Sequence, residues 1–119
     1  MIEHPRAEEL LEAVAKWIDS VRPGLPARDA FLARVAVNVL GVVQRELTLG
    51  PAAHWNAMDR FATLLGHEGD LQTLNAELCA LIRTGQMDVA TPGLLTALKA
   101  NITEQIAIDQ PNYAAVGGR

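Results

Sequence analysis

The sequence predicts an all-α protein, a compact antiparallel bundle of about five helices with the second helix, residues 28–49, at its centre. Two observations predict this fold class. Apolar residues recur at intervals of three and four, which places them on one side of an α-helix. Glycine and proline residues divide the 119-residue chain into segments of helical length. No segment alternates with the period of two that a strand requires, and short connections favour antiparallel neighbours.

The first two predicted helices carry the strongest apolar pattern. The first covers residues 6–21 with one continuous apolar stripe, and Pro23 and Gly24 end it. The second, residues 28–49, is apolar around most of its circumference, and such a helix is normally surrounded by others. Its narrow polar stripe consists of Arg34, Asn38, Gly41, Arg45 and Thr48.

Glycine, proline and N-cap residues predict where the next two helices begin and end. Gly50 and Pro51 predict a corner, with Pro51 at the first position of the third helix, where a missing N–H costs nothing. Gly66 ends that helix. Asp70 is a suitable N-cap for the fourth helix, which closes at Gly85.

The fifth predicted helix begins at Thr91 and Pro92 and runs to about Ile108. Residues 112–119 then form a C-terminal tail. The length suits one domain, so we expect residues 1–119 to fold as a single helical domain.

Composition excludes several classes of function. The net charge is −4 and the ten Lys and Arg residues are spread thinly, so no basic stripe for nucleic acid exists. The most apolar uncharged run, residues 35–44, is about half of the ~20 residues that a membrane span needs. The first residues do not resemble a secretory signal, and we expect a cytoplasmic protein. The single cysteine, Cys79, excludes a disulfide or a cysteine-based zinc site within one chain.

Polar residues at positions that should be apolar are the candidates for a site. Arg34 and Asn38 lie one turn apart on the polar stripe of the second helix. Three interpretations are open. The stripe is the solvent-facing edge of a buried helix, or a buried hydrogen-bond network, or a forked donor for a carboxylate or phosphate.

Two further candidates interrupt apolar stripes. His54 shares a side with Met58 and Phe61, where a histidine is either a rim residue or a ligand or base. Asn75 lies beside Leu71 and Leu78, as a core amide bonded to backbone or as part of a site.

Established chemical signatures are absent. There is no P-loop, no G-x-G-x-x-G and no H-E-x-x-H. His67 and Glu68 form a polar turn rather than a metal site. We therefore predict no catalytic residues, no metal and no cofactor.

Several strings of residues carry a resemblance over nearly the whole chain. They are Phe31–Leu40, Arg45–Leu47 with Gly50-Pro51, Gly69–Leu71, Leu74-Asn75, Leu78-Cys79, Ile82–Gly85 and Pro111–Tyr113. Together they resemble a bacterial family known only as a domain of unknown function. Its members are often encoded beside acyl-CoA dehydrogenases and kinases similar to aminoglycoside phosphotransferases. The resemblance implies a link to acyl-CoA metabolism and adds Arg83 to the candidates, because Arg34, Asn38, Asn75 and Arg83 follow the family pattern.

Two hypotheses of function follow. The leading one is a non-enzymatic accessory protein that binds a partner enzyme through an apolar helix face, and the resemblance implies an acyl-CoA dehydrogenase or phosphotransferase-like kinase as that partner. The alternative is a binding protein or enzyme for an anionic or acyl-CoA-type ligand at Arg34, Asn38, His54 and Asn75. We also expect a homodimer, because a small bundle rich in Val, Leu and Ala often completes its core by pairing.

Overall fold

A computed structural model describes residues 6–113, which form four α-helices and one short 3-10 helix, with no strand among them. The all-α prediction is confirmed for this part of the chain. Residues 114–119 of the predicted tail lie outside the described residues. The chain divides into two compact units, Met1–Gly50 and Pro51–Arg119, which we call the N-terminal and the C-terminal unit.

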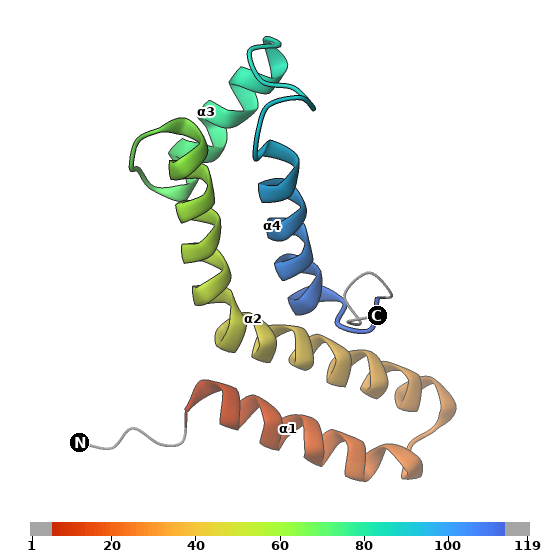
Figure 1. The fold of residues 1–119 in the computed structure, drawn as a ribbon. Helices are drawn as coiled ribbons and strands as arrows, with labels where there is room; N and C mark the ends of the chain where they lie inside the picture. The colour runs from red at the N-terminus through yellow and green to blue at the C-terminus, as the bar shows by residue number, and fades with distance from the viewer. Residues whose placement is uncertain (1–5, 114–119) are drawn as a thin grey trace, which may run out of the picture. The chain divides into compact units, whose positions relative to one another are not determined.

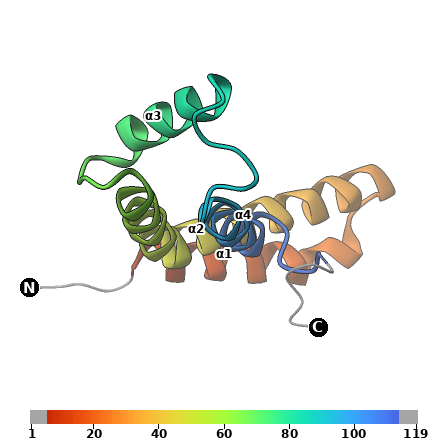
Figure 2. The same ribbon diagram turned by 45° about the horizontal axis from the view of Figure 1, so that its top comes forward.

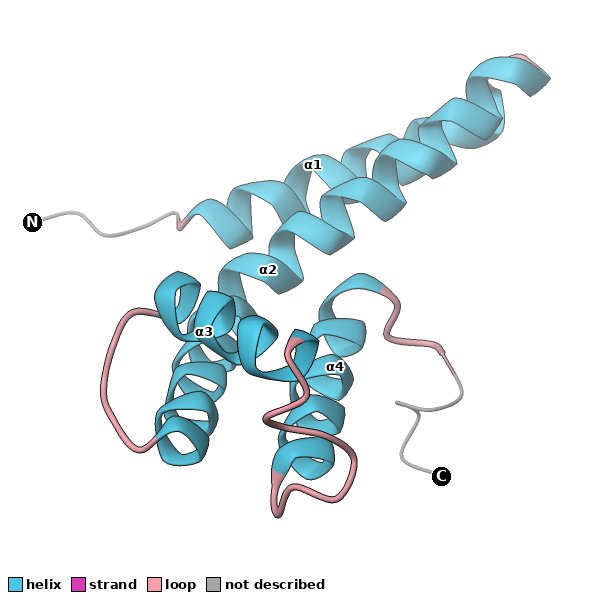
Figure 3. Ribbon diagram, turned by 90° about the horizontal axis from the view of Figure 1, so that it is seen from above, coloured by secondary structure: helices cyan, strands magenta, loops and turns pink. Residues whose placement is uncertain are grey.

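The N-terminal unit is a helical hairpin. Helix α1 spans Ala7–Val21, and after the 3-10 helix Arg22–Gly24 the chain reverses into α2, which spans Ala27–Leu65. Helix α1 runs beside the first part of α2 in the opposite direction (Figure 1), and Figure 3 shows the same pairing from above. The backbone N–H of Arg6 donates to the Glu9 carboxylate at 2.9 Å, which satisfies one of the donors that a helix start leaves open.

The corner predicted at Gly50 and Pro51 requires a correction. One helix continues through both residues where two were predicted, so the described chain has four α-helices rather than five. Proline lacks an N–H and removes one hydrogen bond, to the carbonyl of Leu47, yet the residues on both sides remain helical. The boundary between the two units nevertheless falls at this peptide bond.

The C-terminal unit contains residues 51–65 of α2, helix α3 (Leu71–Arg83) and helix α4 (Leu94–Asp109), as Figure 2 shows from a second direction. Its predicted helix limits are largely confirmed, because they depend on local geometry. Gly66 and Gly85 follow the ends of α2 and α3 with φ of +82° and +81°, a conformation that a side chain would disfavour.

Side-chain hydrogen bonds stabilise the start of α3 and the turn before α4. The predicted N-cap is confirmed, since the Asp70 carboxylate accepts the backbone N–H of Thr73 at 2.8 Å. Thr91, by contrast, caps the turn before α4, because its hydroxyl accepts the backbone N–H of Asp88 at 3.0 Å. Helix α4 therefore begins at Leu94, two residues after the predicted first helical residue, Pro92, and follows Gly93 with φ +84°.

The core of the described residues lies in the C-terminal unit. Phe61, Leu74, Leu78 and Leu94 form one buried cluster and are at most 5% exposed. In contrast, no residue from 28 to 49 is buried, and the central position of this helix stays a prediction. Helical periodicity reports how apolar a helix is, and it does not report what covers it.

Candidate functional site

The most extensive surface feature is an apolar face on the N-terminal hairpin. Between residues 6 and 50 only Gly50 is buried, whereas eleven large hydrophobic side chains are 36–65% exposed. Large aliphatic side chains are among those most often fully buried in a packed core, so this unit lacks a core of its own. We call these eleven residues the hairpin face: Leu10, Val14, Trp17, Val21, Phe31, Leu32, Val35, Val39, Val43, Leu47 and Leu49.

On α1 the exposed apolar residues form a narrow stripe. They recur at spacings of four, three and four, so at about 100° per residue they fall within roughly 60° of one another. The half-buried apolar residues Leu11, Ala15 and Ile18 lie about 100° further round the helix, and we assign that side to the packing against α2.

On α2 the exposed apolar residues also share one side. All seven fall within an arc of about 160°, and the half-buried Ala33, Val37 and Leu40 lie roughly 130° from its centre. Helix α2 thus has two apolar sides, one for α1 and one that is exposed.

The exposed sides of the two helices open on the same side of the hairpin. When each helix is viewed along its axis from its N-terminus, the exposed side is reached from the half-buried side by a rotation in the same direction in α1 and in α2. In two antiparallel helices, equal offsets from the shared interface point the same way. The hairpin face is therefore one continuous surface rather than two separate stripes.

The predicted residues Arg34 and Asn38 lie beside this face on α2. Both are exposed, so within the N-terminal unit these two side chains face solvent and are not part of a buried hydrogen-bond network. They lie roughly 100–140° round the helix from the centre of the exposed apolar arc. They border the hairpin face and do not belong to it.

The other predicted residues lie in the C-terminal unit and are exposed as well. The ring of His54 meets the ring of Trp55 edge-on, with centroids 6.2 Å apart. Asn75 is exposed at the edge of the core side of α3, so the interpretation as a core amide is wrong. Arg83 is in the last turn of α3, where a cation is favourable to the helix dipole.

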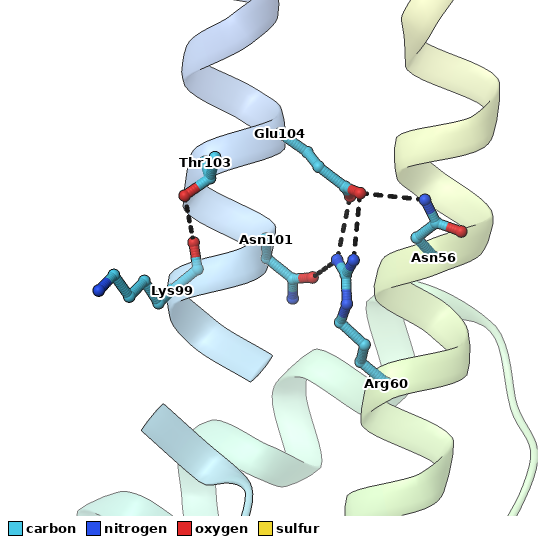
Figure 4. Close-up of polar contacts among 6 residues, drawn as sticks. All are labelled: Asn56, Arg60, Lys99, Asn101, Thr103 and Glu104. Atoms are coloured by element: carbon cyan, nitrogen blue, oxygen red, sulfur yellow. Dashed lines mark hydrogen bonds and ion pairs between the residues drawn. The ribbon is translucent and has the colours of Figure 1, made fainter. Parts of the chain in front are cut away.

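A cluster that the sequence analysis missed joins α2 to α4 (Figure 4). The Arg60 guanidinium donates to both oxygens of Glu104, at 3.0 and 3.1 Å, and to the Asn101 side-chain oxygen at 2.8 Å. The Asn56 amide donates to Glu104 at 3.0 Å. The pairing of Arg60 with Asn101 and of Asn56 with Glu104 shows that the two helices run antiparallel. We call this group the Arg60–Glu104 clamp.

The chemistry of the clamp suits a structural role rather than catalysis or anion binding. The hydrogen bonds from Arg60 hold the pKa of Glu104 below its usual range, and the bond from Asn56 adds to this effect. The same pairing raises the pKa of Arg60. A carboxylate that accepts three hydrogen bonds and a guanidinium that is already paired make a poor base and a poor anion receptor.

A groove lies beside the clamp in the C-terminal unit. It has a volume of about 500 Å³ and is lined by residues 59, 60, 63 and 64 of α2 and by residues 91–93, 96, 97 and 100 before and within α4. None of the five predicted site residues lines it. Arg60 contributes to the wall, but its charge is balanced by Glu104.

A second ionic contact closes the loop between α2 and α3. Nε2 of His67 lies 2.8 Å from the Glu77 carboxylate, and Nδ1 lies 3.0 Å from the backbone carbonyl of Glu68. Both partners are acceptors, so the doubly protonated imidazolium satisfies them best. The bond to the Glu68 carbonyl and then that to Glu77 raise the pKa of His67.

This contact predicts a pH dependence of stability. Since the pKa of His67 is higher in the folded chain, its stabilising effect is fully present below the unfolded pKa of about 6.5. The effect is lost as the pH rises through the folded pKa. We expect His67→Gln to lower the melting temperature at pH 5.5 and to change it little at pH 9. NMR titration of the His67 ring should give a midpoint above 6.5 that falls in Glu77→Gln, and an unchanged midpoint in that variant would contradict the assignment.

The described residues lack two further kinds of functional feature. They contain no group of three or more His, Cys, Asp and Glu side chains placed to hold a metal ion. None of their helices is long and apolar enough to cross a membrane.

Fold and surface together define an all-α protein that consists of an apolar helical hairpin and a three-helix unit. The chain belongs to the family described as Domain of unknown function (DUF6285), whose model matches residues 23–113. The match includes all of α2, α3 and α4, and α1 precedes it. The expected membership of a family of unknown function is confirmed. No curated protein and no solved structure matches the chain.

Proposed function

We propose that this protein acts by association, as an accessory protein that holds another protein chain on its hairpin face. The observation that supports the proposal is the continuous exposed apolar surface of a unit in which no hydrophobic side chain between residues 6 and 50 is buried. Eleven large side chains that are about half exposed present an apolar surface on the order of 1,000 Å². The largest apolar patch of an ordinary monomer is roughly 300–600 Å², and a partner in a standard interface contributes about 800 Å².

Stability of the unit supports the same proposal. Chains with a small core usually need disulfides, metals or association to remain folded, and the only cysteine, Cys79, lies outside this unit. A covering protein surface would supply the apolar contacts that the hairpin lacks. The occupant is either a second copy or a partner enzyme, and the family resemblance implies an acyl-CoA dehydrogenase or phosphotransferase-like kinase.

The alternative function, binding of an anionic or acyl-CoA-type ligand, stays a prediction. Arg34 and Asn38 lie in the N-terminal unit, and His54 and Asn75 lie in the C-terminal unit. All four side chains are exposed, and none lines the groove beside α4.

A charge on the hairpin face should abolish association. We expect Val39→Asp to release the associated chain, because a carboxylate would lose its hydration in the interface. Asn38→Asp introduces the same side chain at the next, exposed position off the face and should keep the chain bound. The measurement is affinity purification of two differently tagged copies expressed in the native host, with the stoichiometry of each retained protein determined by mass spectrometry.

Each outcome decides the proposal. Stoichiometric retention by wild type and Asn38→Asp, with loss in Val39→Asp, supports association through this face. A wild-type chain that retains neither its second copy nor any other protein in stoichiometric amount overturns it. Equal retention by all three proteins would also overturn it, because the face would not be the binding surface.

A further inference from the structure

A regular seam runs along the hairpin face on α2. Six residues follow one another at spacings of four, three, four, three and four, the heptad spacing of helices that pack side by side. They are Arg28, Leu32, Val35, Val39, Val42 and Glu46. The inner four are apolar, and the two ends are an arginine and a glutamate. All six are exposed or half-buried and lie within about 80° of arc on the exposed apolar side.

The charges at the two ends are complementary in an antiparallel arrangement. Arg28 and Glu46 are eighteen residues apart, which is five full helical turns and about 27 Å along the helix. Both are exposed, and neither has an ion-pair partner within the described residues. In an antiparallel pair of α2 helices centred on residue 37, Arg28 of each copy lies opposite Glu46 of the other.

The same register aligns the apolar positions of the seam. It places Leu32 opposite Val42 of the other copy and Val35 opposite Val39. These are the contacts of a and d positions in antiparallel coiled coils. A parallel pair in the same register would instead bring Arg28 beside Arg28 and Glu46 beside Glu46, which is repulsive. The seam therefore selects one direction and one register.

We propose that the occupant of the hairpin face is a second copy of this chain, with the two α2 seams antiparallel and Arg28 of each copy paired with Glu46 of the other. This inference rests on the proposed function, because it names the partner on the same face. The stripe of α1, with spacings of four, three and four, opens on the same side and completes a four-helix bundle of two hairpins. Two faces on the order of 1,000 Å² each would bury about 2,000 Å², which is sufficient for a stable dimer.

Reversal of the end charges tests the register. Each dimer contains two Arg28–Glu46 pairs, so Arg28→Glu or Glu46→Arg creates two repulsive pairs at once. We expect either substitution to raise the dimer dissociation constant about tenfold. The double substitution Arg28→Glu/Glu46→Arg should restore the wild-type value, because both pairs are again opposite in sign. Sedimentation equilibrium of the purified full chain measures the constant.

Two controls keep the test decisive. Arg34→Glu makes the same change on the same helix outside the seam, and it should leave the dissociation constant within about twofold of wild type. Circular dichroism must show equal helix content in all variants, since exposed charge changes should leave the fold intact.

Chemical cross-linking tests the direction. In a Cys79→Ala background, a short bismaleimide should link Arg28→Cys chains to Glu46→Cys chains when the two are mixed. It should not link Arg28→Cys chains to each other, because the two positions 28 lie about 27 Å apart in the antiparallel pair.

The outcomes separate this inference from the proposed function. A dimer with rescue by the double substitution and the mixed cross-link supports both. A monomer that still retains a partner enzyme through Val39 overturns the second copy and leaves the proposed function. A dimer that the charge variants do not change, or that cross-links through Arg28→Cys alone, overturns the antiparallel seam. A monomer with no retained protein overturns both.

Discussion

Leu74→Ala is expected to destabilise the C-terminal unit by roughly 3–5 kcal/mol. Leu74 is fully buried on α3 within the cluster of Phe61, Leu78 and Leu94. Its truncation removes apolar contacts and leaves a cavity, and the neighbouring side chains relax only partly into such a space. For a unit of this size that loss lowers the melting temperature by 10 °C or more, on the order of 4–8 °C per kcal/mol.

A matched control separates burial from chemistry. Leu95→Ala makes the same change on α4 at a side chain that is 54% exposed, and we expect a loss below about 1 kcal/mol. Urea unfolding followed by circular dichroism gives the two values. Hydrogen exchange should show faster opening of α3 and α4 in Leu74→Ala, with α1 unchanged. Equal effects of the two substitutions would contradict the position of the core.

The features that the sequence predicted correctly are local ones. Asp70, Gly66 and Gly85 act through the backbone within a few residues, so their roles follow from residue type and position. Pro51 shows the limit of this reasoning. Its position after Gly50 suits the start of a helix, but a proline inside a helix removes only one hydrogen bond, and the continuous apolar pattern on both sides keeps α2 helical.

Burial was harder to predict because it depends on neighbours. Residues 28–49 are as apolar as a central helix, yet the exposed fractions of Val35, Val39 and Val43 are 41–54%. Asn75, which was predicted as a core amide, is exposed for a related reason. The core side of α3 is centred between Leu74 and Leu78, and this rotation leaves Asn75 at the edge, in solvent.

The Arg60–Glu104 clamp could not be found from periodicity, because its members are separated by more than forty residues. A weaker signal was present. Asn56 and Arg60 are one turn apart on one helix, and Asn101 and Glu104 are one turn apart on another. Two polar pairs of complementary chemistry on neighbouring antiparallel helices favour a contact, but the register of the two helices decides whether it forms.

Removal of the clamp carboxylate is the second large effect that we expect. Glu104→Gln keeps the shape of the side chain but takes the negative charge from two hydrogen bonds of Arg60. Bonds to charged groups are worth about 1.5–3 kcal/mol in buried sites. The side chains of Arg60 and Glu104 are 28% and 30% exposed, so screening by solvent reduces the expected loss to roughly 1–2 kcal/mol.

The pH dependence of this loss has a defined sign. The pKa of Glu104 is lower in the folded chain, so its contribution is present above the unfolded pKa of about 4.3 and is lost as the pH falls through the folded pKa. The difference in unfolding free energy between wild type and Glu104→Gln should therefore be largest near pH 7 and should shrink below pH 4. Asp109→Asn, an exposed change on the same helix, should show a much smaller difference at neutral pH.

A double-mutant cycle of Arg60→Ala and Glu104→Gln isolates the pair itself. Each single change removes the ion pair, so the double variant should be less destabilised than the sum of the two by about 1 kcal/mol. Additive losses would mean that each side chain stabilises the unit through packing alone. In that case the bidentate contact between α2 and α4 would contribute nothing to the position of α4, even though its geometry is favourable.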